Sequence, residues 1–121
     1  MHKVLIVEDE DILRNAYVNV FKMEKFNVAE AANGQIALIQ IEQVRPDIVI
    51  LDVLMPVMNG IEFLEKVNLL KRYPKTKVLV LSNLSDKETV DQVITLGASK
   101  HLVKSSLSPS QLVATVRALL T

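Results

Sequence analysis

The sequence contains no cysteine, and this absence excludes disulfide bridges, thiolate metal sites and cysteine nucleophiles. It also lacks an excess of charge of either sign, because 14 Lys and Arg residues balance 14 Asp and Glu residues. Proteins that bind nucleic acid directly are typically basic, so this balance gives no support to that function. No apolar run approaches the roughly 20 residues that a membrane-spanning helix needs, and the residues after Met1 lack the apolar core of a signal peptide. We therefore expect a soluble, cytoplasmic protein without direct binding to nucleic acid or membrane.

Hydrophobic residues, in contrast, make up 50% of the 121 positions. This fraction is sufficient to bury a core and argues against disorder. The length lies in the usual range for one domain, and no repeat, linker or low-complexity segment divides it. We therefore interpret residues 1–121 as a single domain.

Three short apolar runs, at residues 4–7, 48–51 and 78–81, are uninterrupted by polar residues. Uninterrupted runs of this length are typical of strands that are buried on both faces of a parallel sheet. Residues 27–31 and 100–103 are weaker strand candidates.

Amphipathic helix patterns separate these strands. In the first pattern the apolar positions recur on one helical face, at Ile12, Leu13, Ala16, Tyr17, Val20 and Phe21. Four further helices are expected around residues 37–44, 61–67, 90–96 and 112–120.

Capping signals support the predicted helix ends. Asn59 stands three residues before Glu62 at the start of the third helix, and Gly97 follows the fourth helix. Ser85 and Ser108 each begin a sequence that fits a capping box. The alternation of five strands with five helices predicts a doubly wound α/β fold, with helices on both faces of a five-stranded parallel sheet. A chain of five strands fits the flavodoxin-like order 2-1-3-4-5 best, although periodicity alone does not determine the order.

Polar residues follow the predicted strands, where ligands of open parallel sheets bind. Glu8 and Asp9 follow the first strand, Asp52 the third, Ser82 the fourth and Lys104 the fifth. Neighbouring carboxylates repel one another without a cation, and a set of oxygen ligands points to Mg²⁺. Such a metal would make an aspartate a usable nucleophile toward phosphorus, with the ammonium and hydroxyl groups binding the other phosphoryl oxygens.

With these residues in this order, the sequence resembles the receiver domain of bacterial two-component response regulators, of the chemotaxis-regulator type, over essentially its full length. The segments that carry the resemblance are Val4-Leu5-Ile6-Val7-Glu8-Asp9-Glu10, Asp47-Ile48-Val49-Ile50-Leu51-Asp52, Met55-Pro56-Val57-Met58-Asn59-Gly60, Val80-Leu81-Ser82 and Gly97-Ala98 followed by Lys104.

The resemblance implies a role for each matching residue. Asp52 resembles the phosphoacceptor, which takes a phosphoryl group from a sensor histidine kinase or a phosphotransfer protein. Glu8, Asp9, Asp52 and the backbone carbonyl of Leu54 would bind Mg²⁺. Such a protein is not an enzyme in the usual sense, because it catalyses only its own phosphoryl transfer and dephosphorylation.

Lys104 resembles the lysine that pairs with the phosphoryl group, and Ser82 resembles the switch hydroxyl that moves toward it. Phosphorylation adds about 1.5 to 2 negative charges and three strong acceptors. The movement of Ser82 would then change the surface formed by the fourth helix, the fifth strand and the fifth helix. The resemblance leaves the kinase, the downstream effector and dimerisation on phosphorylation undetermined, and it does not decide between a stand-alone protein and a part of a larger regulator.

The chain departs from the family pattern at three positions. His101 replaces an aromatic residue that takes part in the switch, and is a candidate for the same role against the alternative of an ordinary surface histidine. Ser105 replaces a proline that follows the lysine in a cis peptide; since a non-proline cis bond costs about 2.5–4 kcal/mol, we expect a trans bond or a strained loop. Asn83 replaces a small residue and is expected to crowd phosphoryl access.

Leu54 and Leu84 occupy the positions that tune phosphoryl lifetime in the family. Neither side chain can orient an attacking water molecule, which predicts slow self-dephosphorylation.

Three other functions remain open at this point. An aspartate-nucleophile phosphohydrolase usually has a second aspartate two residues after the nucleophile, where this chain has Leu54. A flavin or nucleotide binder would need a phosphate-binding loop in place of the acidic residues at positions 8–11. A receiver that works without phosphate, as a constitutive interaction module, is compatible with the three departures.

Overall fold

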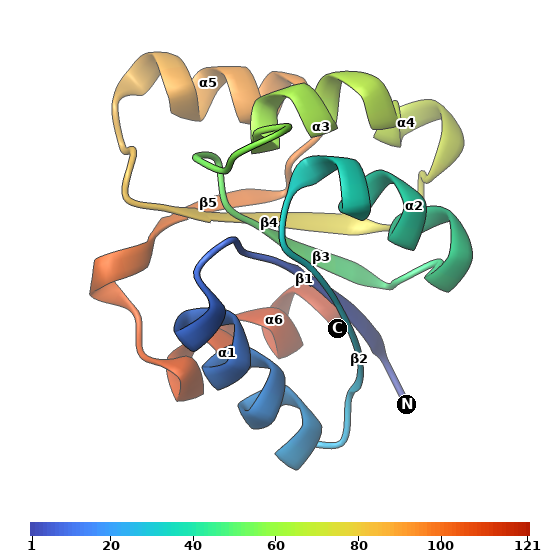
Figure 1. The fold of residues 1–121 in the computed structure, drawn as a ribbon, viewed down its shortest axis with the longest axis vertical. Coiled ribbons are helices and arrows are strands. Elements are labelled where there is room, and N and C mark those ends of the chain that lie inside the picture. Colours follow the sequence, from blue (N-terminus) through green and yellow to red (C-terminus); the bar gives the residue numbers. More distant parts are fainter.

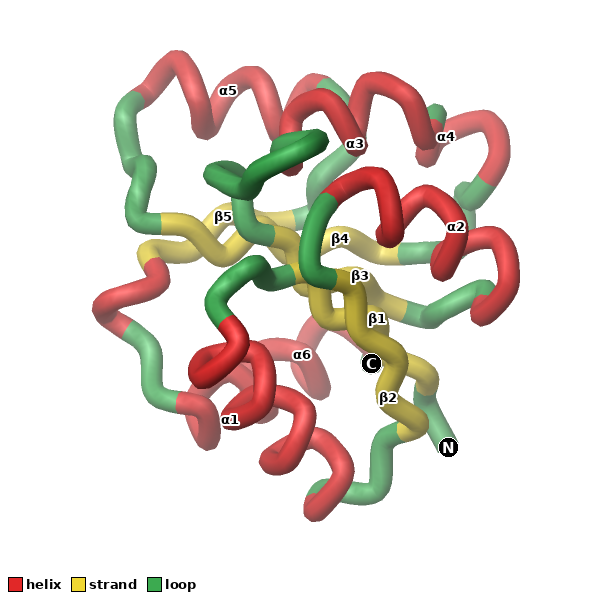
Figure 2. The backbone as a smooth tube through the Cα atoms, viewed as in Figure 1, coloured by secondary structure: helices red, strands yellow, loops and turns green.

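The computed structural model describes residues 1–121 and contains a five-stranded parallel sheet (Figures 1 and 2). The spatial order of the strands is β2-β1-β3-β4-β5, as predicted. The strands are β1 (Lys3–Val7), β2 (Asn27–Ala31), β3 (Ile48–Leu51), β4 (Lys77–Ser82) and β5 (Lys100–Val103). Both weaker strand candidates are therefore confirmed as strands.

Helices cover both faces of the sheet. Figure 1 shows α1 and α6 on one face, and α2, α3, α4 and α5 on the other. The bounds are α1 (Asp11–Met23), α2 (Gly34–Val44), α3 (Gly60–Val67), α4 (Leu69–Arg72), α5 (Lys87–Thr95), the 3₁₀ helix η1 (Lys104–Ser106) and α6 (Pro109–Leu120). None of them combines the length and the hydrophobicity that crossing a bilayer requires.

The prediction of five helices missed the single turn α4. It is separated from α3 by Asn68, whose φ of 53° lies in the left-handed region. Asparagine adopts this conformation more readily than most residues, so the backbone turns here and then resumes a helical course. The apolar pattern continues through the break, because Val67 and Leu69 are both buried.

The hydrophobic core forms two layers, one on each side of the sheet. Alternate residues of a strand point to opposite faces, so that Leu5 and Val49 pack toward α2 and α3 whereas Val4 and Ile48 pack toward α1 and α6. All four side chains are fully buried. This arrangement explains why the central strands read as uninterrupted apolar runs.

At the helix N-termini, two capping predictions were confirmed and one was wrong. Reciprocal capping boxes link Asn59 with Glu62 at α3 and Ser108 with Gln111 at α6. At α5, however, the N-cap is Asp86 rather than Ser85, and its carboxylate accepts a hydrogen bond from the Thr89 N–H. Gly97 follows α5 with a φ of 111°, a conformation in which an L side chain would be strained. The prediction that this glycine ends the helix is therefore confirmed.

The predicted buried face of α1 was wrong at one edge. Tyr17, Val18 and Phe21 are buried, but Ile12 is 88% exposed and Ala16 is also exposed. Ile12 and Ala16 lie four residues apart and share one line along the helix, beside the line that faces the sheet. The buried stripe is therefore centred further round the helix than the apolar pattern indicated.

Candidate functional site

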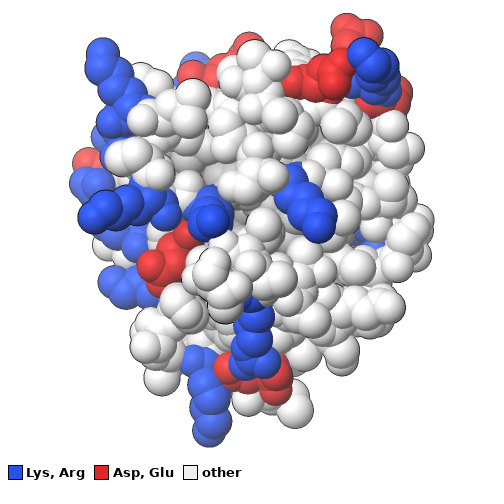
Figure 3. Space-filling view, turned by 180° about the vertical axis from the view of Figure 1, so that it is seen from behind, with Lys and Arg blue, Asp and Glu red and all other residues white.

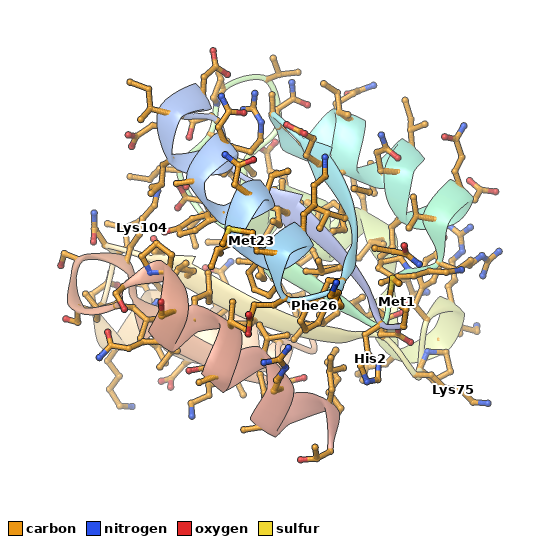
Figure 4. All side chains as sticks on the ribbon, turned by 90° about the horizontal axis from the view of Figure 1, so that it is seen from below. Met1, His2, Met23, Phe26, Lys75 and Lys104 are labelled. Atoms are coloured by element: carbon orange, nitrogen blue, oxygen red, sulfur yellow. The ribbon has the colours of Figure 1, made fainter.

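The five predicted site residues all lie at the carboxyl edge of the sheet. Glu8 and Asp9 directly follow β1, Asp52 directly follows β3, Ser82 ends β4, and Lys104 directly follows β5. Because β3 pairs with both β1 and β4, Asp52 stands between the residues from the neighbouring strands. In Figure 4 the labelled Lys104 lies far from Met1 and Lys75, which belong to the opposite end of the molecule.

Lys104 joins two carboxylates that are distant in the sequence. Its Nζ atom lies 2.6 Å from Glu8 Oε1 and 2.8 Å from Asp52 Oδ2. The side chains are largely shielded from solvent, with exposed fractions of 9% for Lys104, 3% for Glu8 and 8% for Asp52. Ion pairs of this kind are screened much less than pairs on an open surface.

Backbone N–H groups hold the other oxygen of each carboxylate. Val53 N–H donates to Asp52 Oδ1 over 2.7 Å, and Glu10 N–H donates to Glu8 Oε2 over 3.0 Å. Each carboxylate is thus fixed by one backbone donor and by the Lys104 ammonium. This pattern orients Asp52 before any ligand arrives.

Burial and hydrogen bonding have opposing effects on the pKa values of Glu8 and Lys104. Burial raises the pKa of Glu8 above its usual value, although the hydrogen bond from Lys104 partly opposes this change. Burial alone would lower the pKa of Lys104, but the hydrogen bonds to Asp52 and Glu8 outweigh it and raise this pKa. Lys104 therefore carries a positive charge at neutral pH.

Three carboxylates meet at this edge of the sheet. Glu8, Asp9 and Asp52 each offer an oxygen, and these oxygen atoms lie within 4.8 Å of one another. Against them stands one ammonium group, so the cluster carries an excess of negative charge. An oxygen-only donor set fits Mg²⁺, which binds proteins through one or two carboxylates while keeping several waters. Leu54, whose carbonyl was predicted as a further ligand, is 61% exposed in the loop after β3.

Ser82 and His101 both bond to Leu84. The buried Ser82 accepts a hydrogen bond from the Leu84 N–H at its Oγ atom, over 3.1 Å. His101 Nε2 lies 2.8 Å from the Leu84 carbonyl oxygen, and since a carbonyl can only accept, Nε2 carries the hydrogen. The ring of His101 is thus turned toward the loop after Ser82 and contacts its backbone.

Two other departures from the family pattern are bonded to each other. Asn83 Oδ1 accepts a hydrogen bond from the Ser105 N–H over 3.0 Å. No peptide bond of the chain is cis, in agreement with the expectation for the bond between Lys104 and Ser105. Sequence reasoning treated these positions separately and missed their contact.

Sequence reasoning also missed Arg14, whose side chain is only 13% exposed. Its guanidinium donates to the Glu8 carbonyl over 2.8 Å, to Asp11 over 2.6 Å and to Glu30 over 2.9 Å. Burial would lower the pKa of Arg14, but the bonds to Glu30 and Asp11 outweigh it and raise this pKa. Arg14 thereby anchors the backbone at the acidic pair. The spacing of Asp11 and Arg14 on one helical face was the available signal.

The turn after β3 allows very little space near Asp52. A Cβ atom on Gly60 would overlap the Asp52 carbonyl oxygen, and it would lie 3.0 Å from Val53 Cα. Glycine is therefore required here for close approach of α3 to the end of β3. In the same loop Val57 has a φ of 69°, an unusual conformation for a β-branched residue.

A small groove opens beside the acidic cluster, at Lys104. It has a volume of about 310 Å³ and lies between α1 and the segment after β5. Its lining comprises Glu10, Leu13, Tyr17, Asn83, Lys104, Ser105, Leu107 and Pro109. A larger hollow of about 540 Å³, between α2 and the α3–α4 segment, contains none of the acidic cluster. Seen from behind, Lys and Arg side chains are dense along the left side of the molecule, and much of the right half of that face is uncharged (Figure 3).

Comparison with known proteins places this geometry in a family. The family model described as response regulator receiver domain matches residues 4–117. Chemotaxis protein CheY of Listeria monocytogenes is 38% identical over 105 residues, which cover 86% of this chain and 87% of that protein. Transcriptional regulatory protein DegU of Brevibacillus brevis is 36% identical over 104 residues, which cover 84% of this chain. The chain matches only 43% of the length of DegU.

Solved structures show the same fold. CheY4, a chemotaxis protein of Vibrio cholerae, has a TM-score of 0.89 and 33% identity, with 98% of each chain covered. The CheX-CheY-BeF3-Mg complex from Borrelia burgdorferi contains a chain with a TM-score of 0.87 and 28% identity, covering 99% of this chain and 90% of that one. The match extends over nearly the whole sequence and the whole fold, and this chain belongs to the response regulator receiver domain family.

Proposed function

We propose that this receiver accepts a phosphoryl group on Asp52 in the presence of Mg²⁺, and signals by a change of shape. The observation that carries the proposal is the contact of Lys104 Nζ with both Asp52 and Glu8, next to the carboxylate of Asp9. A shielded aspartate, a paired ammonium and an acidic cluster that suits a divalent cation are the parts that phosphoryl transfer to a carboxylate needs.

The residues of the site have distinct roles in the transfer. A carboxylate oxygen of Asp52 attacks phosphorus, and the bond from phosphorus to the donor nitrogen of a histidine kinase or phosphotransfer protein breaks. Glu8, Asp9, Asp52 and the Leu54 carbonyl would hold Mg²⁺, whose positive charge would offset the negative charge of the phosphoryl oxygens. Lys104 is already beside Asp52 Oδ2 and binds a phosphoryl oxygen as it arrives.

Ser82 supplies the response to phosphorylation. Its hydroxyl accepts a bond from the Leu84 N–H in this structure, and its hydrogen is free to donate to a phosphoryl oxygen. A shift of Ser82 toward Asp52 carries Leu84 with it, and the contact of Leu84 with His101 extends the shift to β5. The output surface is therefore the one formed by α5, β5 and α6.

A specific observation supports His101 as part of this switch. Its ring already contacts the backbone two residues after the switch hydroxyl, over 2.8 Å. His101 is also half-buried, which distinguishes it from a fully solvated surface histidine. The Borrelia chain with a similar fold is described in a complex with beryllofluoride and magnesium, and this also favours a phosphorylated function for the present chain.

Labelling with a small phosphodonor tests the proposal. Incubation of the wild type with acetyl phosphate and Mg²⁺ should add one phosphoryl group, whereas Asp52→Asn should add none. Asp91→Asn is the matched control, because Asp91 is a surface residue of α5 that should not affect labelling. Equal labelling of wild type and Asp52→Asn would contradict Asp52 as the phosphoacceptor, whereas no labelling of either would favour the alternative of a receiver that works without phosphate.

A further inference from the structure

The loop between β4 and α5 is bonded to the segment around Lys104 at two points. Leu84 accepts a hydrogen bond from His101 over 2.8 Å, and Asn83 accepts one from the Ser105 N–H over 3.0 Å. His101 and Ser105 stand on either side of Lys104 in the chain. The loop that begins at Ser82 is thus tied to the lysine segment both before and after the lysine.

The second of these bonds depends on two unusual residues at once. A proline at position 105 would have no N–H to donate, and a small apolar residue at position 83 would offer no side-chain acceptor. Asn83 therefore supplies the acceptor and Ser105 the donor of this hydrogen bond, and the bond requires both residues.

The Asn83–Ser105 bond lies beside the reacting groups without touching them. Asn83 directly follows the switch hydroxyl of Ser82, and Ser105 directly follows Lys104. Both bonded residues are exposed, so the bond contributes little to the buried core. The bond therefore links the segments that carry the hydroxyl and the ammonium, in addition to the pairing of Ser82 with Val103 in the sheet.

We propose that Asn83 is a positioning residue, which ties the Ser82 loop to the Lys104 segment so that both donors meet the phosphoryl group in register. This inference rests on the proposed function, because it concerns the same phosphoryl group on Asp52. Asn83 holds the Ser105 backbone and, through it, the adjacent lysine. The contact between His101 and Leu84 is a separate tie and persists when Asn83 is replaced.

Binding of beryllofluoride with Mg²⁺, followed by NMR titration, tests the positioning role. Asn83→Ala and Ser105→Pro should each weaken binding by about two- to tenfold, the range that corresponds to one neutral hydrogen bond. The double variant should be no weaker than the weaker single variant, because both changes remove the same bond. Ser105→Ala is the matched control, since it keeps the N–H and should bind as the wild type does.

The same experiment separates two kinds of failure. If the wild type does not bind beryllofluoride, or if Asp52→Asn binds it equally well, the proposed function and the positioning role both fail. If wild-type binding requires Asp52 but the effects of Asn83→Ala and Ser105→Pro multiply, or are absent, only the positioning role is overturned. Should Ser105→Pro not fold, hydrogen exchange at the Ser105 amide decides: Asn83→Ala should accelerate it, Ser85→Ala should not, and equal rates would overturn the role.

Discussion

Lys104 donates a hydrogen bond from Nζ to Asp52 Oδ2 over 2.8 Å, across 52 residues of sequence. The same ammonium contacts Glu8, so one positive charge serves two shielded carboxylates, while Asp9 adds a third acidic group to the cluster. This excess of negative charge explains why the cluster could hold a divalent cation, and the two contacts give the lysine a structural role.

Replacement of Lys104 by methionine should destabilise the fold. The change leaves Glu8 and Asp52 shielded from water without their cation, and breaking a buried pair in this way costs about 3 kcal/mol. Urea unfolding monitored by circular dichroism measures the loss. Mg²⁺ should restore part of the stability, because it binds the folded acidic cluster.

Lys87→Met is the control for this experiment. Lys87 pairs with Asp91 on α5, but its side chain is 91% exposed, so its replacement should cost less than about 0.5 kcal/mol. Equal losses for the two variants would contradict the structural role assigned to Lys104.

Gly60→Ala should damage the site as well as the fold. The added Cβ would overlap the Asp52 carbonyl oxygen, and the resulting displacement should cost about 1–3 kcal/mol and slow labelling of Asp52. Gly97→Ala provides the comparison. Its φ of 111° makes alanine strained, by about 1–2 kcal/mol, at a position remote from Asp52. Unchanged labelling kinetics in folded Gly60→Ala would show that this turn does not position Asp52.

The N-cap of α5 should contribute to the pH dependence of stability. Hydrogen bonds from the Thr89 N–H and hydroxyl lower the pKa of Asp86 below its ordinary value. A carboxylate whose pKa is lower in the folded state stabilises the fold above its unfolded pKa, and the contribution is lost as pH falls through the folded pKa. Asp86→Ala should therefore be less stable than the wild type at neutral pH, and the difference should shrink in acid. Thermal unfolding between pH 2 and 7 measures it, and a constant difference would contradict the assigned role of the charge.

Leu54 should give the phosphoryl group on Asp52 a long half-life. Leu54 is largely exposed beside Asp52 but has no group that could orient an attacking water molecule. We expect a phosphoryl half-life much longer than seconds, and a shorter one in Leu54→Asn, whose amide can bond to water. Loss of radiolabel from purified phosphoprotein in Mg²⁺ measures both, and a wild-type half-life of seconds would contradict this expectation.

Much of the fold could be predicted because local pattern and burial agree. The runs at 48–51 and 78–81 form central strands that are covered on both sides, so their hydrophobicity is continuous. Ile12 was misplaced because an apolar residue near the start of an amphipathic helix need not face the sheet. The break at Asn68 was missed because it depends on one left-handed residue and leaves the apolar pattern intact.

The convergence of Asp9, Asp52 and Lys104 could also be predicted, since the carboxyl ends of parallel strands share one edge. The finer contacts could not. The bonds from Arg14 to the Glu8 carbonyl and from Ser105 to Asn83 depend on side-chain directions in segments that meet only in the folded chain. Residue type and spacing do not determine those directions.

The position of the phosphoryl group tests the central claim most directly. Borohydride reduces an acyl phosphate, so treatment of the acetyl phosphate-labelled protein followed by peptide mass spectrometry identifies the modified carboxylate. We expect homoserine at position 52, only when Mg²⁺ is present during labelling. Modification at another carboxylate, or modification of Asp52 that is independent of Mg²⁺, would contradict the assignment of Asp52 as a metal-assisted phosphoacceptor.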